Sequence, residues 1–102
     1  MTKAPITVIE EVWENGQLQE KITYKNGKPH GPYEWLDDEG QLEHKGNYKN
    51  GKPHGPYEWF EEGQLWKKAN FKHGKQHGLC QYFDEEGNLI QSETWENGKL
   101  VK

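Results

Sequence analysis

Apolar and polar residues alternate over short stretches of this chain, and glycine turns separate the stretches. Leu18 and Ile22 fall on the same side of an extended strand as Tyr24, because the side chains of a strand point alternately to its two faces. Glycines interrupt the chain too often for a helix, and no apolar pattern at helical spacing lies between them. The pattern therefore predicts strands at residues 6–13, 17–24, 32–36, 41–48, 56–60, 64–71, 79–83 and 88–95, with a short ninth strand at Leu100 and Val101.

Tight turns join these strands. Asn-Gly pairs begin at Asn15, Asn26, Asn50 and Asn97, and both residues of such a pair tolerate the positive φ angles of two-residue hairpin turns. Strands joined by turns this short pair as antiparallel neighbours. The expected fold is all-β, a single-layer antiparallel β-meander that is twisted and open at both ends. At roughly 4.8 Å per strand, the sheet would be about 40 Å long.

The chain is also a repeat array. The string YKNGKPHGPYEW occurs unchanged at residues 24–35 and 48–59, and a degraded copy, FKHGKQHGLCQY, follows at residues 71–82. A second phrase, glycine followed by Gln or Asn and then Leu, begins at Gly16, Gly40, Gly63 and Gly87. We expect one domain, 1–102, with an N-terminal cap and first hairpin at 1–23, repeats at 24–47 and 48–70, and a divergent repeat with a C-terminal cap at 71–102.

The alternation sorts the side chains into an aromatic face and a charged face. Tyr33 and Trp35 of the first intact copy, and Tyr57 and Trp59 of the second, join the face that carries Tyr24. A His-Gly pair precedes each short strand, at His30, His54 and His77. We expect the glycine of each pair to let a neighbouring aromatic ring lie flat across the backbone, an arrangement that stabilises glycine in sheets.

Composition indicates a folded chain with a thin core. Leu, Ile, Val and Phe are few for a chain that buries an aliphatic core, which taken alone would suggest disorder. However, the five Trp, five Tyr and three Phe residues recur at repeat positions. Each large ring can bury roughly 150 to 250 Å², so the rings can replace aliphatic bulk.

Charge and cysteine content narrow the class of protein. The net charge of −4 comes largely from acidic turns, and it disfavours nucleic acid as a partner. A single cysteine, Cys80, excludes an internal disulfide. No apolar stretch approaches the roughly 18 residues of a membrane span, and the first six residues lack the apolar region of a signal peptide. We therefore expect a cytoplasmic location.

Metal chemistry at the histidines is disfavoured by their spacing. Two strands separate consecutive His-Gly pairs, so His30, His54 and His77 would stand roughly 10 Å apart, whereas zinc holds its ligands at about 2 Å. We expect these histidines to serve turn packing and hydrogen bonding. His73, His77 and Cys80 form one closer cluster, but a fourth ligand is missing. Neither a metal nor any other cofactor is expected.

Catalysis is disfavoured as well. The acidic clusters fall in exposed turns, where water screens them and no apolar surroundings raise a pKa. The sequence has no serine in a nucleophile elbow and no phosphate-binding loop before a helix, and Cys80 replaces a repeat tyrosine and is expected to be a packing residue. Lys28 and Lys52 alternate with acidic turns along the sequence rather than forming a stripe, so we expect them to promote solubility.

The repeat resembles a known family. Tyr-Lys-Asn-Gly-Lys-Pro-His-Gly-Pro-Tyr, then Glu-Gly-Gln-Leu and a further Tyr-Lys-Asn-Gly, is similar to the bacterial variant of the MORN repeat (membrane occupation and recognition nexus) over residues 13–100. Arrays built of this variant resemble the YwqK-type antitoxins and the immunity proteins found beside secreted bacterial toxins. The resemblance implies a non-enzymatic β-meander that binds a protein. The third copy departs from the pattern at Gln76, Leu79, Cys80 and Tyr82, which argues against a uniform binding face.

A partner-binding site is predicted on the aromatic face. A single-layer sheet leaves both faces open, and Trp and Tyr are common anchors of protein interfaces. We expect the anchors to be the rings of the short strands, which should be more exposed than Tyr24, Tyr48 and Phe71, with turn acids beside them that attract a basic toxin. The predicted site consists of Tyr33, Trp35, Tyr57, Trp59, Asp37, Asp38, Glu61 and Glu62.

Four alternatives to this site and function stay open at this stage. The rings could bury one another within a curled sheet, or two copies could form a homodimer through the aromatic face or the sheet edges. The chain could instead be a membrane-associated or lipid-associated scaffold. Because twelve residues are identical in tandem copies, it could also be an engineered or consensus array without a natural partner.

Overall fold

The computed structural model describes the backbone of residues 6–102 and the side chains from residue 9 onward. These residues form one antiparallel sheet of 11 strands. Residues 1–5, which belong to the segment considered for a signal peptide, lie outside the described residues. The strands are β1 (Ile6–Val12), β2 (Leu18–Lys25), β3 (Lys28–Leu36), β4 (Leu42–Lys49), β5 (Lys52–Pro53), β6 (Gly55–Glu61), β7 (Gln64–Lys72), β8 (Lys75–Gln76), β9 (Gly78–Phe83), β10 (Leu89–Glu96) and β11 (Lys99–Leu100).

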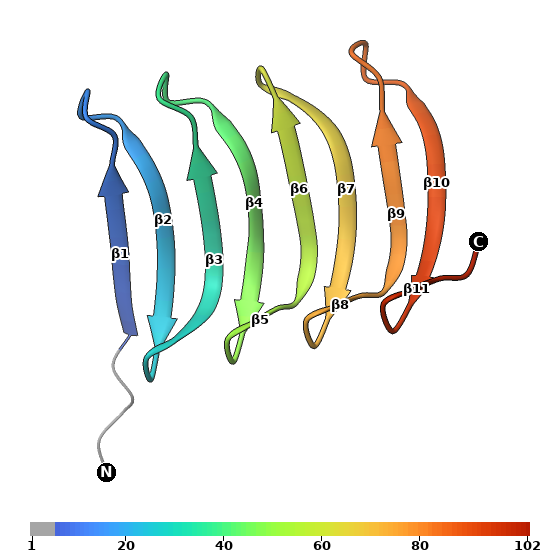
Figure 1. Cartoon of the computed structure of the whole chain (residues 1–102), viewed down its shortest axis with the longest axis horizontal. Helices are drawn as coiled ribbons and strands as arrows, with labels where there is room; N and C mark the ends of the chain where they lie inside the picture. Colours follow the sequence, from blue (N-terminus) through green and yellow to red (C-terminus); the bar gives the residue numbers. More distant parts are fainter. Residues whose placement is uncertain (1–5) are drawn as a thin grey trace.

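The predicted single-layer meander is confirmed. The long strands pair in the order β1-β2-β3-β4-β6-β7-β9-β10-β11, and the short strands β5 and β8 pair with β4 and β7. Successive turns lie at opposite edges of the sheet, so that four turns line the upper edge in Figure 1 and four line the lower edge. The molecule measures 47 × 37 × 15 Å, and the short dimension shows that no second layer formed by residues 6–102 covers either face.

Two-residue Asn-Gly turns form at three of the four predicted positions. Asn26, Asn50 and Asn97 have φ angles of 55°, 53° and 50°, as a two-residue hairpin turn requires. Asn15 lies in a longer turn, in which the Trp13 N–H donates to the Gln17 carbonyl. The Asn15 side-chain oxygen accepts a hydrogen bond from the Gln17 N–H, so this asparagine stabilises its turn through its side chain instead.

The strands that follow the lower turns begin earlier than predicted. β3 starts at Lys28 instead of residue 32, because the tight turn pairs Lys25 with Lys28 and Tyr24 with Pro29. In the next two repeats the corresponding residues form the separate short strands β5 and β8. The predicted ninth strand at Leu100 and Val101 is β11, one residue earlier.

The predicted role of the His-Gly glycines is wrong. A Cβ built on Gly31 or Gly78 would meet only Thr23 or Asn70 side-chain atoms at 3.7 Å, and one on Gly55 would meet nothing within 4 Å, so no ring lies over these glycines. They have φ angles of 103°, 100° and 94°, which side chains rarely adopt. The His-Gly pair therefore bends the chain from the lower turn into the following strand.

The core is one thin cluster in the middle of the sheet. The buried apolar residues among those described are Tyr57, Ala69 and Cys80, on the adjacent strands β6, β7 and β9. The close approach of a ring to glycine occurs at Gly46 of β4, where a Cβ would overlap the Tyr57 ring. Burial of Cys80 confirms that it packs in this core.

Candidate functional site

Strand register brings the ring side chains of successive strands into rows on one face of the sheet. Trp35 pairs with His44, His44 with Trp59, Trp59 with Lys67, and Lys67 with Tyr82. In the next row Tyr33 lies opposite Gly46, and Tyr57 lies opposite Ala69. We call this surface the aromatic face; its ring-bearing residues are Tyr24, Tyr33, Trp35, His44, Tyr48, Tyr57, Trp59, Phe71, Tyr82 and Trp95.

The rings contact one another across the strands and hold the aromatic face together. His44 stacks on Tyr33, Trp35 and Tyr57, with ring centroids 5.6, 6.0 and 5.8 Å apart. Tyr57 also lies 4.8 Å from the Trp59 ring and meets Phe71 edge-on at 5.8 Å. Aromatic pairs of this kind contribute about 0.5–1.5 kcal/mol each beyond the area they bury. His44 and Tyr57 are therefore the hub of the face.

Exposure differs among the predicted anchors. Tyr57 is only 8% exposed, so the expectation that it is more exposed than Tyr24, Tyr48 and Phe71 is wrong. The reason is Gly46, which lets the Tyr57 ring sit against the backbone of β4. Tyr33, Trp35 and Trp59 are half-buried and keep part of their rings open to solvent. Their role as anchors stays a prediction.

Burial shifts the pKa values of the hub residues and of Tyr33. It lowers the pKa of His44, and the nearby carboxylates of Glu43 and Glu20 oppose the effect. Burial, with Glu20 beside the phenol, raises the pKa of Tyr33 to about 12, and burial also raises the pKa of Tyr57. The phenols are thus protonated near neutral pH. The Tyr57 hydroxyl and His44 Nδ1 lie 3.2 Å apart and share a hydrogen bond.

The opposite face carries a ladder of alternating charge. Lys21 lies opposite Glu34, Glu34 opposite Lys45, Lys45 opposite Glu58, and Glu58 opposite Lys68. Cross-strand pairs of opposite charge favour this register over one shifted by a residue. Lys45 and Glu58 form an ion pair at 3.5 Å, which contributes at most about 1 kcal/mol because both groups are partly exposed.

The repeated histidines make hydrogen bonds between repeats, as predicted. The Nδ1 atoms of His30, His54 and His77 accept hydrogen bonds from the backbone N–H groups of Asn50, His73 and Asn97, at 3.3, 3.5 and 3.3 Å. Each histidine thereby ties its own lower turn to the turn of the next repeat. Among residues 6–102, no three His, Cys, Asp or Glu side chains lie together in a group that could hold a metal ion.

The two edges of the sheet have opposite charge. Asp37 and Asp38 lie in the β3–β4 turn, and Glu61 and Glu62 lie at the end of β6 and in the β6–β7 turn, so all four are at the same edge of the sheet, as predicted. The expectation that Lys28 and Lys52 form no stripe is wrong, because a meander places alternate turns at opposite edges. The lower-edge turns carry Lys25, Lys28, Lys49, Lys52, Lys72, Lys75 and Lys99.

Sequence reasoning missed one exposed tryptophan near the acidic edge. Trp66 of β7 is 39% exposed and lines two open cavities together with Glu61 and Glu62. The repeat did contain a signal for Trp66. The residue after the Leu of the Gly-Gln-Leu phrase is polar in the first two phrases, at Gln19 and Glu43, and is Trp66 in the third phrase, which begins at Gly63.

Comparison with known families agrees with this architecture. The MORN repeat variant matches residues 8–26, 29–50, 53–73 and 76–97, and the MORN repeat itself matches residues 23–32. The chain belongs to the MORN repeat variant family. No curated protein and no solved structure matches this MORN array. Membership establishes a repeat scaffold of a kind that generally binds proteins or membranes.

The chemistry of the MORN array is that of a binding surface. The aromatic face offers half-buried rings, and the edges offer solvated charges of opposite sign. Across residues 6–102, the structure contains no helix of the length and apolarity needed to span a membrane.

The burial of His44 predicts a dependence of stability on pH. Because the folded state lowers the pKa of His44, acidification from above the ordinary value of 6.5 protonates the unfolded chain first and so reduces the free energy of unfolding. We expect wild type to lose stability relative to His44→Phe, which keeps a ring but takes no proton, as the pH falls from 7.5 to 5.5. Urea unfolding at several pH values measures this difference. A difference that is constant or moves the other way contradicts the burial of His44.

Proposed function

We propose that this MORN array is a non-enzymatic antitoxin or immunity protein that binds and neutralises a toxin encoded beside it, in the cytoplasm. The aromatic face is the observation that carries the proposal: an uncovered sheet face that keeps Tyr33, Trp35 and Trp59 half-open to solvent. Trp and Tyr rings on a rigid sheet are favourable anchors, because little side-chain entropy is lost when they are covered. Neutralisation follows when the array covers the active surface of the toxin.

The acidic upper edge supports a basic partner. Asp37 and Asp38 follow the strand of Trp35, whereas Glu61 ends the strand of Trp59 and Glu62 follows it. A basic surface can therefore meet rings and carboxylates together. Carboxylates at the rim of an interface mainly increase the rate of association, whereas rings at its centre mainly slow dissociation.

Trp35 and Trp59 are the test positions of the proposed site. The protein encoded in the adjacent reading frame serves as partner, with binding measured by calorimetry and protection by co-expression. We expect Trp35→Ala or Trp59→Ala to weaken binding by about 2 kcal/mol or more while the chain stays folded. Changing Asp38 and Glu62 to lysine should slow association, and the effect should fade in high salt.

Tyr57→Ala is the control for an effect on folding rather than on binding. The Tyr57 ring is buried, so its loss should lower the free energy of unfolding by about 3–5 kcal/mol. Sedimentation of the free chain detects a homodimer through the aromatic face. If the folded Trp35→Ala and Trp59→Ala variants bind and protect as wild type does, the aromatic face is scaffold and the proposal fails.

An anionic lipid surface is the second candidate partner, favoured by the lysines of the lower edge. The Lys52 stem lies over Gly74, and the Lys28 and Lys75 stems lie over Gly51 and Gly98, so these lysines stack in register along the edge. Each lysine near an anionic bilayer contributes about 1 kcal/mol.

Flotation with vesicles containing phosphatidylserine tests this second candidate. If lipid binding is the function, the triple change of Lys28, Lys52 and Lys75 to glutamate should weaken vesicle binding at least about 100-fold, since each neutralised lysine alone removes about 1 kcal/mol. The control is Lys21→Glu on the charged face, compared with the single change Lys52→Glu at the lower edge, which alters the net charge by the same amount. No flotation of the wild-type chain at low salt excludes the lipid candidate and leaves the protein partner.

A further inference from the structure

Trp66 occupies a special position in its hairpin. Trp59 pairs with Lys67, and Phe60 pairs with Leu65, so Trp66 is an extra residue that bulges out of the ladder. The corresponding extra residues are Gln19 in the β1–β2 hairpin, Glu43 in the β3–β4 hairpin and Ile90 in the β9–β10 hairpin. A bulge aims its side chain away from the regular pattern of the strand, and in this copy the side chain is an indole.

The turn beside Trp66 is one residue shorter than its neighbours. Glu61 pairs directly with Gln64, and the turn closes on Glu62 and Gly63 with φ angles of 50° and 81°. The adjacent upper turns are longer, because the Asp37 N–H donates to Gln41 and the Asp84 N–H donates to Asn88. The short turn leaves open space on both sides: a cavity of about 880 Å³ towards the β9–β10 turn and one of about 460 Å³ towards β4.

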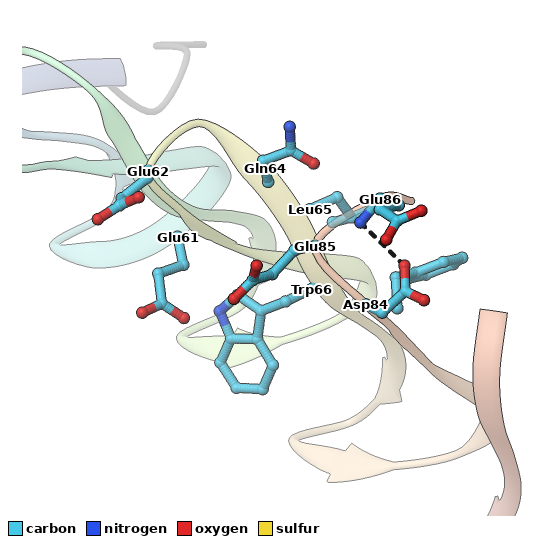
Figure 2. A pocket seen from close by; sticks show the side chains of 9 residues that line it. Glu61, Glu62, Gln64, Leu65, Trp66, Asp84, Glu85 and Glu86 are labelled. Carbon is cyan, nitrogen blue, oxygen red and sulfur yellow. Dashed lines mark hydrogen bonds between the residues drawn. The ribbon is translucent and has the colours of Figure 1, made fainter. Parts of the chain in front are cut away.

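The larger cavity is strongly acidic. Glu61, Glu62, Asp84, Glu85 and Glu86 line it, and no lysine does. Asp84 Oδ1 accepts hydrogen bonds from the Asn88 and Glu86 N–H groups, which hold the pKa of that carboxyl below its usual value. Within residues 6–102 the one ion pair joins Lys45 and Glu58, so these carboxylates have no cation of their own. Figure 2 shows Glu61 and Trp66 extending to the same side of the β6–β7 hairpin.

Among the side chains that the structure describes, none gives the Trp66 ring the ring contact or hydrogen bond that the other tryptophans have. Trp13 packs edge-on against Trp35, Trp59 lies against Tyr57, and Trp95 Nε1 donates to Glu93. One strand position away, the Lys67 ammonium lies 4.7 Å from the Trp59 ring centroid and 5.5 Å from that of Tyr82. The Lys67 ammonium is thus paired with the Trp59 indole. The Trp66 indole lies among carboxylates instead, and no ammonium group of residues 6–102 is stacked on it.

We propose that the cavity between the β6–β7 and β9–β10 turns is a binding site for a cationic side chain, Lys or Arg, of a bound protein. The cation stacks on Trp66, and Glu61, Glu62, Glu85 and Glu86 surround it. An indole face attracts a cation by about 0.5–2 kcal/mol, and the carboxylates add charge complementarity. This inference rests on the proposed protein-binding function, and it adds a specificity site in the β6–β7 hairpin, where Trp66 replaces the polar Gln19 and Glu43 of the two preceding hairpins.

A single-charge probe tests the site without the partner. N-acetyl-arginine methylamide is titrated into the whole chain and followed by the NMR signals of the backbone amides and the Trp66 indole N–H; the citrulline analogue has the same shape without the charge. We expect saturable shifts at Trp66 and in residues 61–64 and 84–88 with the arginine probe, and none with citrulline. Trp66→Leu should weaken probe binding about fivefold, and Trp66→Phe should restore part of it.

The matched control is Glu39→Gln, which removes one carboxylate from the preceding upper-edge turn, lines neither cavity and should leave probe affinity unchanged, whereas the double change of Glu61 and Glu85 to glutamine should abolish saturation. Equal shifts with citrulline, shifts spread evenly over all upper turns, or unchanged affinity in Trp66→Leu would overturn the site. The aromatic-face proposal is tested separately, because its variants Trp35→Ala and Trp59→Ala leave this cavity intact.

Discussion

The structure depends on one constraint: a sheet with no second layer has nothing above its faces, so each side chain can be buried only by its neighbours within the same face. The rings of successive strands solve this by lying against one another, and the densest point is the Tyr57 ring between Gly46 and Ala69. Stability of such an array is a sum of contacts between neighbouring strands. Ring residues therefore recur in successive copies, because each copy supplies rings that the next copy packs against.

The same constraint links stability to function. The rings that hold the strands together are the ones left half-open to solvent, so Trp35 and Trp59 can pack against the array and still offer area to a partner. The meander also separates the charges: turns that alternate along the sequence fall on opposite edges, with acids at one edge and lysines at the other. Under the proposed function, a partner that approaches the aromatic face would meet an asymmetric rim, and this rim would fix the partner's orientation.

Local rules predicted most of the fold, and long-range packing decided the remainder. Period-two alternation and Asn-Gly turns were enough for the meander and for most strand ends, and the histidine bonds followed from their recurrence in the turns. The predictions that failed concern residues whose environment comes from other strands. Tyr57 is buried because of Gly46, eleven positions earlier and one strand away, and Lys28 joins Lys52 only through the topology. Trp66 could be recognised as a candidate only from the register, which shows that it is a bulge beside a short turn.

A double-mutant cycle on Gly46 and Tyr57 tests most directly whether in-plane packing holds the sheet. Gly46→Ala places a methyl group where the Tyr57 ring lies, and overpacking of this kind costs about 1–3 kcal/mol. In a Tyr57→Ala background every ring atom that the methyl group would meet is gone, so the account predicts that Gly46→Ala then costs less than about 0.5 kcal/mol, giving a coupling energy of at least about 1 kcal/mol. Additive effects, measured as free energies of unfolding in urea, would contradict the claim that this contact holds the sheet together.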